Sequence, residues 1–223
     1  MTGIVIAIDG TSASGKSTNA RLLAQELGFW YVDTGRMYRT FAWKCLRSGL
    51  DLNNAAKLGR SCLRWRTEII ADGNQLVLRM PKTFQPDALR TAAVASGASK
   101  VSSVPAVRRW MRKIQRSCIS FGSLVMEGRD IGTNVFPETD FKYYLDAGVK
   151  ARADRRGSET VLDIQERDNR DSQRGCAPLM LGLGARYIDT STLAIEDTFK
   201  LILADFRAKS SQSVPLVPAS ILA

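Results

Sequence analysis

Apolar residues recur along the chain with two different periods. Short continuous apolar runs are typical of buried parallel strands, and longer stretches with apolar positions three and four residues apart are typical of helices. The strand pattern occupies residues 4–8, 29–32, 123–126, 141–145 and 186–189. The helical pattern occupies residues 17–27, 37–48, 88–100, 106–118, 150–156, 163–174 and 194–209. Their alternation predicts an α/β fold, a parallel sheet covered by helices on both faces.

Two segments depart from this alternation. Residues 63–70 and 75–80 each alternate apolar and polar positions, and Asp72-Gly73-Asn74 lies between them. Such a pair around a turn predicts a β-hairpin, which we interpret as an inserted module on the substrate side. Residues 210–223 contain Ser and Pro without periodicity, so we expect a poorly ordered tail.

Composition is that of an ordinary soluble chain of one or two domains. The chain has 223 residues, of which 44% are hydrophobic and 24% charged. Its formal net charge of +10 has two interpretations. A basic chain can bind nucleic acid, or it can gather cations around the phosphates of a small substrate. The arginines lie in short clusters spread along the chain, which favours the second interpretation.

Cysteine and histidine usage narrows the chemistry. The four cysteines form no C-x-x-C pair and histidine is absent, so a Cys₂His₂ zinc site is excluded and a Cys₄ site is disfavoured. We expect free thiols in a reducing cytosol. The N-terminus lacks a signal-peptide pattern and no apolar run reaches the length of a membrane span. We therefore expect a cytoplasmic protein whose chemistry depends on positioning, carboxylates, cations or metal.

One segment carries a phosphate-binding motif. Residues 10–17 match G-x-x-x-x-G-K-[ST], after a buried strand and before a helix, where the mechanism of the motif requires them. The alternative is a structural glycine-rich turn. In the motif, Lys16 follows the β- and γ-phosphates and the Ser17 hydroxyl binds Mg²⁺. The predicted ATP-binding residues are Gly10, Thr11, Ser12, Ala13, Ser14, Gly15, Lys16, Ser17 and Thr18.

Three further clusters could supply cations for a phosphoryl transfer. The first, residues 33–39, follows the second strand and contains Arg39, which could clamp an acceptor phosphate. The second is Glu127-Gly128-Arg129-Asp130, after the third strand. The third comprises Arg152, Arg155 and Arg156 with the charged residues 166–174. The alternatives are a solvated helix start, an exposed turn and a salt-bridged surface, respectively.

Taken together, these segments resemble bacterial cytidylate kinases. The resemblance rests on Ile6–Gly10 leading into Gly15-Lys16-Ser17, on Asp33-Thr34-Gly35 with Tyr38-Arg39, and on two more specific pieces. These are Glu127–Thr133 running into Val135-Phe136-Pro137, and Glu166–Asp171 followed by Arg174 and Ala177-Pro178-Leu179. The similarity extends over about residues 4 to 206.

The resemblance implies a nucleoside monophosphate kinase fold with a five-stranded parallel sheet, a monophosphate-binding insertion at about 61–100 and a lid at about 152–168. The remaining residues to 209 would complete one domain. It implies ATP as phosphate donor, Mg²⁺, and CMP or dCMP as acceptor. In it, Thr34, Tyr38 and Arg39 flank the acceptor, and Arg129 and Arg167 hold its phosphate. Ser99, Arg108 and Asp130 read the cytosine, Asp171 and Arg174 bind the sugar, and Arg152, Arg155 and Arg156 close on the transferred group.

Two departures from the family pattern are visible. Nine residues, 157–165, separate Arg156 from Glu166, which is a shorter lid than the family usually has. Residues 180–185 lack the proline and the acidic residue that usually follow Ala177-Pro178-Leu179. A short lid excludes water less well, so leakage into ATP hydrolysis is the expected consequence.

The expected reaction is direct transfer of the γ-phosphoryl group of ATP to (d)CMP by a monomer that binds neither nucleic acid nor a membrane. A kinase for UMP, dTMP or AMP is the nearest alternative. A nucleic-acid-stimulated ATPase or a nucleotide sensor is the alternative of a different class, suggested by the net charge. The sequence lacks a helix-turn-helix signature and an aromatic stacking platform, which disfavours it.

Overall fold

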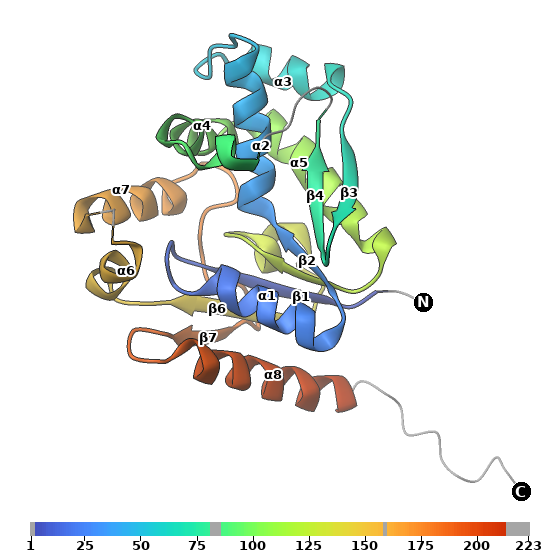
Figure 1. The fold of residues 1–223 in the computed structure, drawn as a ribbon, viewed down its shortest axis with the longest axis vertical. Helices are drawn as coiled ribbons and strands as arrows, with labels where there is room; N and C mark the ends of the chain where they lie inside the picture. Colours follow the sequence, from blue (N-terminus) through green and yellow to red (C-terminus); the bar gives the residue numbers. More distant parts are fainter. Residues whose placement is uncertain (1–2, 81–85, 158–159, 213–223) are drawn as a thin grey trace, which may run out of the picture.

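A single sheet organises the molecule. The computed structural model describes residues 3–80, 86–157 and 160–212 (Figure 1). Within them the sheet has seven strands in the order β3-β4-β2-β5-β1-β6-β7. The strands are β1 (Val5–Gly10), β2 (Trp30–Asp33), β3 (Glu68–Asp72), β4 (Gln75–Arg79), β5 (Leu124–Glu127), β6 (Phe141–Asp146) and β7 (Arg186–Asp189).

The strand count corrects the expectation of a five-stranded sheet. The five predicted strands, β2, β5, β1, β6 and β7, do pair in parallel. Strands β3 and β4 form an antiparallel pair, and β4 joins the sheet beside β2 through the register pair Tyr31 and Gln75. The hairpin strands therefore extend the same sheet, and they cover the edge of β2 that would otherwise present unpaired backbone groups.

Helices follow the predicted periodicity, with two exceptions. The helix expected over 88–100 is divided into a short turn, Pro86–Arg90, and α4, which begins at Ala92, and helix α3 was not predicted. Residues 63 and 64 were expected to begin a strand, but they end helix α3, whose buried Leu58, Ser61 and Cys62 recur at helical spacing. The Asn54 side chain caps this helix by accepting a hydrogen bond from the Lys57 amide at 2.9 Å. The helices are α1 (Lys16–Leu27), α2 (Thr34–Arg47), α3 (Ala55–Arg64), α4 (Ala92–Ser102), α5 (Pro105–Ser117), α6 (Val149–Arg156), α7 (Val161–Ser172) and α8 (Ile195–Gln212).

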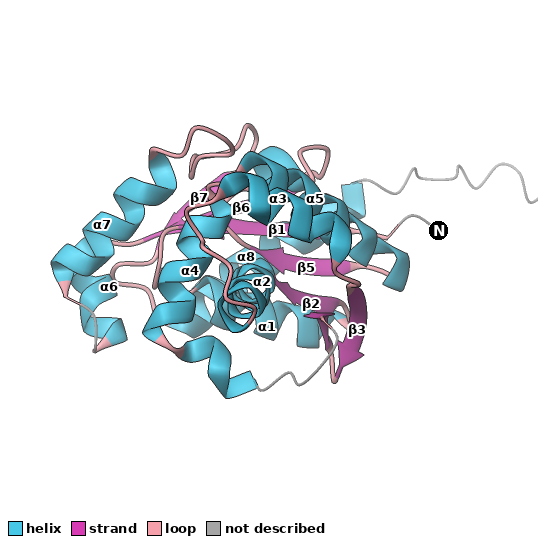
Figure 2. Cartoon of the chain, turned by 90° about the horizontal axis from the view of Figure 1, so that it is seen from above, coloured by secondary structure: helices cyan, strands magenta, loops and turns pink. Residues whose placement is uncertain are grey.

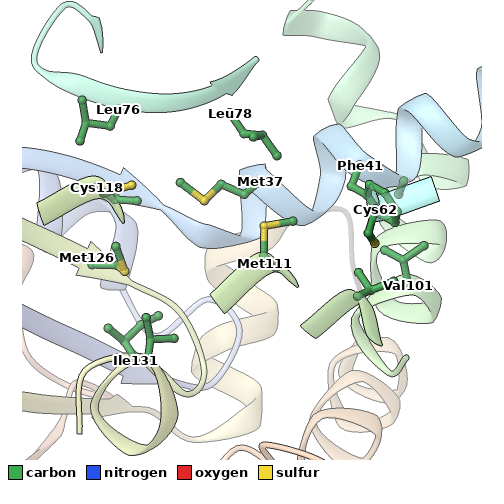
Figure 3. Close-up of a cluster of buried hydrophobic side chains, with 14 of the residues drawn as sticks. Met37, Phe41, Cys62, Leu76, Leu78, Val101, Met111, Cys118, Met126 and Ile131 are labelled. Carbon is green, nitrogen blue, oxygen red and sulfur yellow. The ribbon is translucent and has the colours of Figure 1, made fainter. Parts of the chain in front are cut away.

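Side chains alternate along the central strand β1, so it presents apolar residues on both faces of the sheet. Helices cover both faces. Ile6 and Ile8 of β1 face one apolar cluster, which α1 and α8 complete. Val5 and Ala7 face a second cluster, to which α2 and α5 contribute. Figure 2 shows helices on both sides of the strands. Figure 3 shows the side chains of this second cluster, to which Met37 of α2, Met111 of α5 and Met126 of β5 contribute.

Short helical turns complete the described chain. They are η1 (Pro86–Arg90), η2 (Cys118–Phe121) and a π-helical turn, η3 (Ile131–Val135). Helix α8 continues three residues into the predicted tail, and residues 213–223 lie outside the described residues. Among the helices of the described residues, none combines the length and the apolar character that crossing a membrane requires.

The parallel strands determine where polar residues gather. The carboxyl ends of β1, β2, β5, β6 and β7 lie at the same edge of the sheet. Those ends carry Gly10, Asp33, Glu127, Asp146 and Asp189, in that order. Ligands of open α/β sheets bind outside this edge, so the residues that follow these strands are the candidates for a functional site.

Candidate active site

The loop after β1 can only form with glycine at its first position. Gly10 has φ +140°, and a Cβ there would lie 1.8 Å from the carbonyl oxygen of Leu145 in β6. Ala13 and Gly15 also have positive φ, at +61° and +88°. Helix α1 begins at Lys16, directly after the loop, so the positive end of the helix dipole faces it. This is the backbone arrangement of a phosphate cradle.

Lys16 is a buried cation in this loop. Only 5% of the residue is exposed, and its Nζ donates hydrogen bonds to the Thr11 carbonyl oxygen and, at 3.4 Å, to Ser14 Oγ. Burial and, second, repulsion from the Arg129 guanidinium together lower the pKa of Lys16 to about 7, while nearby carboxylates act against this shift.

A buried carboxylate, Glu127 at the end of β5, lies beside them. Its Oε1 accepts a 2.6 Å hydrogen bond from the Tyr31 hydroxyl, and the Ser17 hydroxyl lowers the pKa of the carboxyl against the effect of burial. The Glu127 carbonyl oxygen accepts a 2.7 Å bond from Thr34 Oγ1. Burial raises the pKa of the Glu127 carboxyl. Glu127 thus joins the phosphate loop to β2 and to the start of α2.

The pair of Ser17 and Glu127 fits a magnesium site of the P-loop type. A hydroxyl and a carboxylate are the hard oxygen donors that Mg²⁺ prefers. Within the described residues, no group of three or more His, Cys, Asp or Glu side chains could hold a metal ion. A magnesium ion here would take its remaining ligands from nucleotide phosphates and water, as Mg²⁺ commonly does.

Helix α6 directs three arginines at the loop. Arg152 Nη1 donates to the Ser12 carbonyl oxygen at 3.3 Å, and Arg155 Nη1 donates to the Ala13 carbonyl oxygen at 3.4 Å. Arg156 Nη2 donates to Ser12 Oγ at 3.2 Å. The predicted lid arginines therefore contact the phosphate loop itself.

Helix α7 is tied to α6 by an ion pair. Arg152 Nη1 lies 2.6 Å from Asp168 Oδ2, and both side chains are largely buried. Arg155 also donates to the hydroxyl and the carbonyl oxygen of Thr190, after β7. Arg167 lies on α7, but its side chain is outside the described residues.

The carboxylate of Asp171, also on α7, pairs with two of the predicted acceptor-site arginines. Asp171 Oδ2 accepts a 2.8 Å hydrogen bond from Arg129 Nε, and Asp171 Oδ1 pairs with Arg174. The structure thus brings these three predicted residues together and fixes the direction of both guanidinium groups.

A buried ion pair lies beyond them. Arg108 Nη2 is 2.5 Å from Asp130 Oδ2, and the side chains are 6% and 9% exposed. Asn134 Nδ2 donates to the same carboxylate oxygen at 2.9 Å, and Arg108 Nη1 donates to the Ser102 carbonyl oxygen at 3.1 Å. The Arg108 guanidinium carbon lies 5.7 Å from the centre of the Tyr38 ring. Arg108 Nε is buried without a hydrogen-bond partner among the described residues.

For three other predicted residues, Arg39, Ser99 and Thr18, the structure shows only local contacts or exposure. Arg39 pairs with Asp33 at 2.9 Å near the start of α2. Ser99 is half-buried on α4, where its carbonyl oxygen accepts a bond from the Ser102 hydroxyl. Thr18 is exposed on the first turn of α1.

Several residues of the site carried no role in the sequence-based prediction. They are Asp9, Tyr31, Asp146, Asp168 and Thr190, and Glu127 was only part of a quoted motif. For Asp9, Glu127 and Asp146 a signal exists, because each is an acidic residue at the carboxyl end of a buried strand. Tyr31 and Thr190 offer no comparable signal.

Comparisons with known proteins identify the family. The family model described as cytidylate kinase matches residues 6–208. A cytidylate kinase of Pelotomaculum thermopropionicum is 40% identical over 89% of this chain and 94% of that relative. One of Clostridioides difficile is 36% identical over 92% of this chain and 98% of that relative. Among solved structures, a gluconokinase of Sinorhizobium meliloti matches 95% of both chains with 10% identity and a TM-score of 0.49. The chain belongs to the cytidylate kinase family.

Proposed function

We propose that the phosphate loop and the clusters around Arg129 and Arg108 together transfer the γ-phosphoryl group of ATP to CMP or dCMP. Membership of the family makes the chain a (d)CMP kinase; the roles of its residues are our proposal. One observation supports the proposal most directly. Three arginines of α6, which are far from the phosphate loop in sequence, donate hydrogen bonds to its Ser12 and Ala13, so cations converge where the phosphates of ATP would lie.

On the donor side, residues 10–18 bind the ATP phosphates. Lys16 now donates to a backbone carbonyl oxygen and a hydroxyl, both neutral acceptors. A phosphate oxygen is a stronger acceptor, so Lys16 exchanges these bonds for contacts with the transferred group. Ser17 and Glu127 hold Mg²⁺, which when bound neutralises charge on the β- and γ-phosphates.

On the acceptor side, Arg129, Arg167 and Arg39 hold the phosphate of CMP. Asp171 with Arg174 binds the sugar, and Thr34 and Tyr38 flank the nucleotide. Arg108, Asp130 and Ser99 read the base, since a carboxylate can accept from the exocyclic amine of cytosine and a guanidinium can donate to its ring acceptors. The ion pair between Arg108 and Asp130 supports this assignment, because it holds both groups in a fixed orientation.

The reaction needs no general base from the chain. A phosphate oxygen of CMP is already an anionic nucleophile, so alignment with the γ-phosphorus is the main requirement. The absence of histidine from the sequence fits this mechanism. Cations that converge on the transferred group stabilise the charge on its equatorial oxygens.

We further propose that residues at about 152–168 act as a short lid and those at about 61–100 as the monophosphate-binding module of one domain, 1–209. The contacts of Arg152, Arg155 and Arg156 with the phosphate loop support the first assignment. The hairpin of β3 and β4 beside β2 supports the second.

A coupled assay of ADP release tests the proposal. Purified protein with ATP and Mg²⁺ is given CMP, dCMP, UMP, dTMP or AMP, and a reaction without acceptor is the control. We expect strong stimulation by CMP and dCMP. Fastest turnover with another monophosphate would overturn the base-reading roles. ADP release that is equally fast without acceptor would indicate an ATPase, and nucleic acid would then be tested as its stimulant.

We also propose a cytoplasmic monomer that acts on free nucleotides without nucleic acid or membrane. Free thiols support a reducing compartment. Cys45, Cys62 and Cys118 are buried and unpaired, and burial raises their thiol pKa values to about 12, 11 and 12. Light scattering of the eluting protein during size-exclusion chromatography measures its mass, and a dimeric mass would contradict the monomer.

A further inference from the structure

Asp9 lies at the junction of the two halves of the site. It is in β1, directly before Gly10, and is 5% exposed. Its Oδ1 accepts a 2.8 Å hydrogen bond from the Ile131 amide, and its Oδ2 accepts a 2.7 Å bond from the Gly132 amide. Both carboxylate oxygens are thus committed to the backbone of one turn, which is more than a hundred residues away in sequence.

That turn carries the acceptor-side residues. Arg129 and Asp130 directly precede the two amides that Asp9 binds, and the carbonyl oxygen of Asp130 accepts the first bonds of η3, from Asn134 and Val135. The Asp130 side chain holds Arg108. A shift of this turn would therefore move the guanidinium of Arg129 and the whole pair of Arg108 and Asp130.

The turn packs closely against β1 and β6. A Cβ on Gly132 would lie 3.5 Å from Asp9 Oδ2 and 3.1 Å from Cγ of Lys142 in β6. A side chain at this position would make the neighbouring Lys142 side chain shift, because 3.1 Å is tighter than an ordinary contact. The carboxylate of Asp9 and the glycine at 132 are thus two parts of the same contact.

The charge on Asp9 is unfavourable for the fold. Burial raises the pKa of its carboxyl to about 6, and the nearby Asp130 contributes in the same direction, while the two amides and Lys16 act against it. A buried carboxylate that is held at such a cost is more common at functional sites than in ordinary cores.

We propose that Asp9 is a positioning residue that fixes the turn 128–132 against the phosphate loop, so that the acceptor phosphate lies in line with the γ-phosphate. Asp9 itself does not contact substrate. It acts through Arg129 and Asp130, and the inference rests on the acceptor roles proposed above for those two residues.

Asp9→Asn is the first test. The amide keeps one acceptor oxygen and turns an NH₂ group towards an amide N–H, so one of the two bonds is lost. Loss of one such bond in a buried site corresponds to about a tenfold effect. We expect the KM for CMP to rise about tenfold and kcat to fall, while the KM for ATP stays within about twofold.

Asp205→Asn is the matched control. Asp205 lies on α8, on the opposite face of the sheet, and accepts bonds from Tyr143, Arg186 and Lys209. The same chemical change there should lower the Tm and leave the KM for CMP unaltered.

Two outcomes for Asp9→Asn would overturn the inference. A lower Tm with an unchanged KM for CMP would make Asp9 an ordinary structural residue. An equal rise in the KM for ATP and for CMP would mean that Asp9 acts on the phosphate loop. If Asp9→Asn does not fold, Gly132→Val provides the same test, because a branched side chain extends beyond a Cβ that already lies 3.1 Å from Lys142 Cγ, and so pushes the turn away while Asp9 keeps its carboxylate. An unaltered KM for CMP in that variant would likewise contradict the inference.

Wild-type protein without CMP-dependent ADP release would instead refute the proposed function.

Discussion

The cations of the donor side and those of the acceptor side have different partners. On the donor side, Lys16 and Arg155 donate to backbone carbonyl oxygens of the phosphate loop or of Thr190. On the acceptor side, Arg108 and Arg129 are paired with the carboxylates of Asp130 and Asp171. Lys16 and Arg155 are thus held by neutral groups, and the two acceptor-side arginines by opposite charges. Arg152 is the exception on the donor side, because it contacts the phosphate loop and also pairs with Asp168.

This difference has a functional meaning. A cation on a neutral carbonyl gains strongly when a phosphate oxygen replaces it. A guanidinium paired with a carboxylate gains less, but its direction is fixed before the ligand arrives, which favours discrimination between ligands. The donor side is therefore suited to bind triphosphate charge, and the acceptor side to select a base and a sugar.

Removal of Lys16 should have the largest effect. Lys16→Ala deletes the cation that meets the transferred group, and the loss of one such stabilising contact lowers kcat by roughly 10²–10³-fold. Steady-state rates with saturating ATP and CMP measure it. Lys44→Ala is the control. It removes a lysine of α2 that lies over the Trp65 ring, and it should leave kcat unchanged. An unchanged kcat in Lys16→Ala would refute the role of the loop.

Asp130→Ala tests the acceptor side. It leaves Arg108 buried without its carboxylate, and breaking such a pair costs about 3–5 kcal/mol of folding free energy. We expect kcat/KM for CMP to fall much more than kcat/KM for UMP or AMP, while the KM for ATP changes little. Denaturant unfolding measures the loss of folding free energy. Steady-state rates on the panel of monophosphates measure the changes in kcat/KM.

Asp130→Asn keeps the shape of the side chain and serves as the milder variant. It should retain more stability than Asp130→Ala and still lose preference for cytosine. If either variant loses activity equally on every monophosphate, Asp130 does not read the base.

The two sides also differ in how far the sequence predicts them. The donor loop is a contiguous segment with its own motif, so the role of Lys16 could be predicted from spacing alone. The acceptor side joins Arg108, Asp130 and Asp171 from three separate segments, and only the resemblance to a family indicated that they meet. The hydrogen bonds of Asp9 escaped prediction because the amides that it binds come from a turn far along the chain.

The same reason explains the errors in the fold. Local periodicity predicted the five parallel strands. Whether the hairpin joins the sheet depends on its pairing with the edge of β2, and the residues of the hairpin alone do not indicate that pairing. The last two residues of α3 were assigned to a strand because Leu63, at its exposed side, continues an alternating apolar pattern into the residues that follow.

The pH dependence of stability distinguishes the buried Asp9 from ordinary acids. Its carboxyl pKa is raised from the usual 3.8 to about 6, so between these values the folded chain keeps a proton that the unfolded chain releases. Stability from this group therefore falls as pH rises through the window. A shift of this size corresponds to about 3 kcal/mol.

Asp9→Asn removes this titration. The unfolding free energy of the wild type minus that of Asp9→Asn should fall by up to about 3 kcal/mol between pH 4 and pH 7. Denaturant unfolding at several pH values measures the difference, in which the titrations shared by the two proteins largely cancel. A difference that is flat across this range, or that rises with pH, would contradict a raised pKa for Asp9.

Arg39 should give the smallest change in stability, and it shows where the acceptor side meets solvent. Its pair with Asp33 is partly exposed, and such pairs contribute about 0–1 kcal/mol. Arg39→Ala should therefore hardly alter the unfolding free energy, yet raise the KM for CMP by about tenfold through loss of one charged contact to phosphate. Arg66→Ala removes an arginine from the exposed pair with Glu68 and should change neither quantity. If Arg39→Ala leaves the KM for CMP unchanged, Arg39 does not hold the acceptor phosphate, and the proposed contacts to that phosphate are those of Arg129 and Arg167 alone.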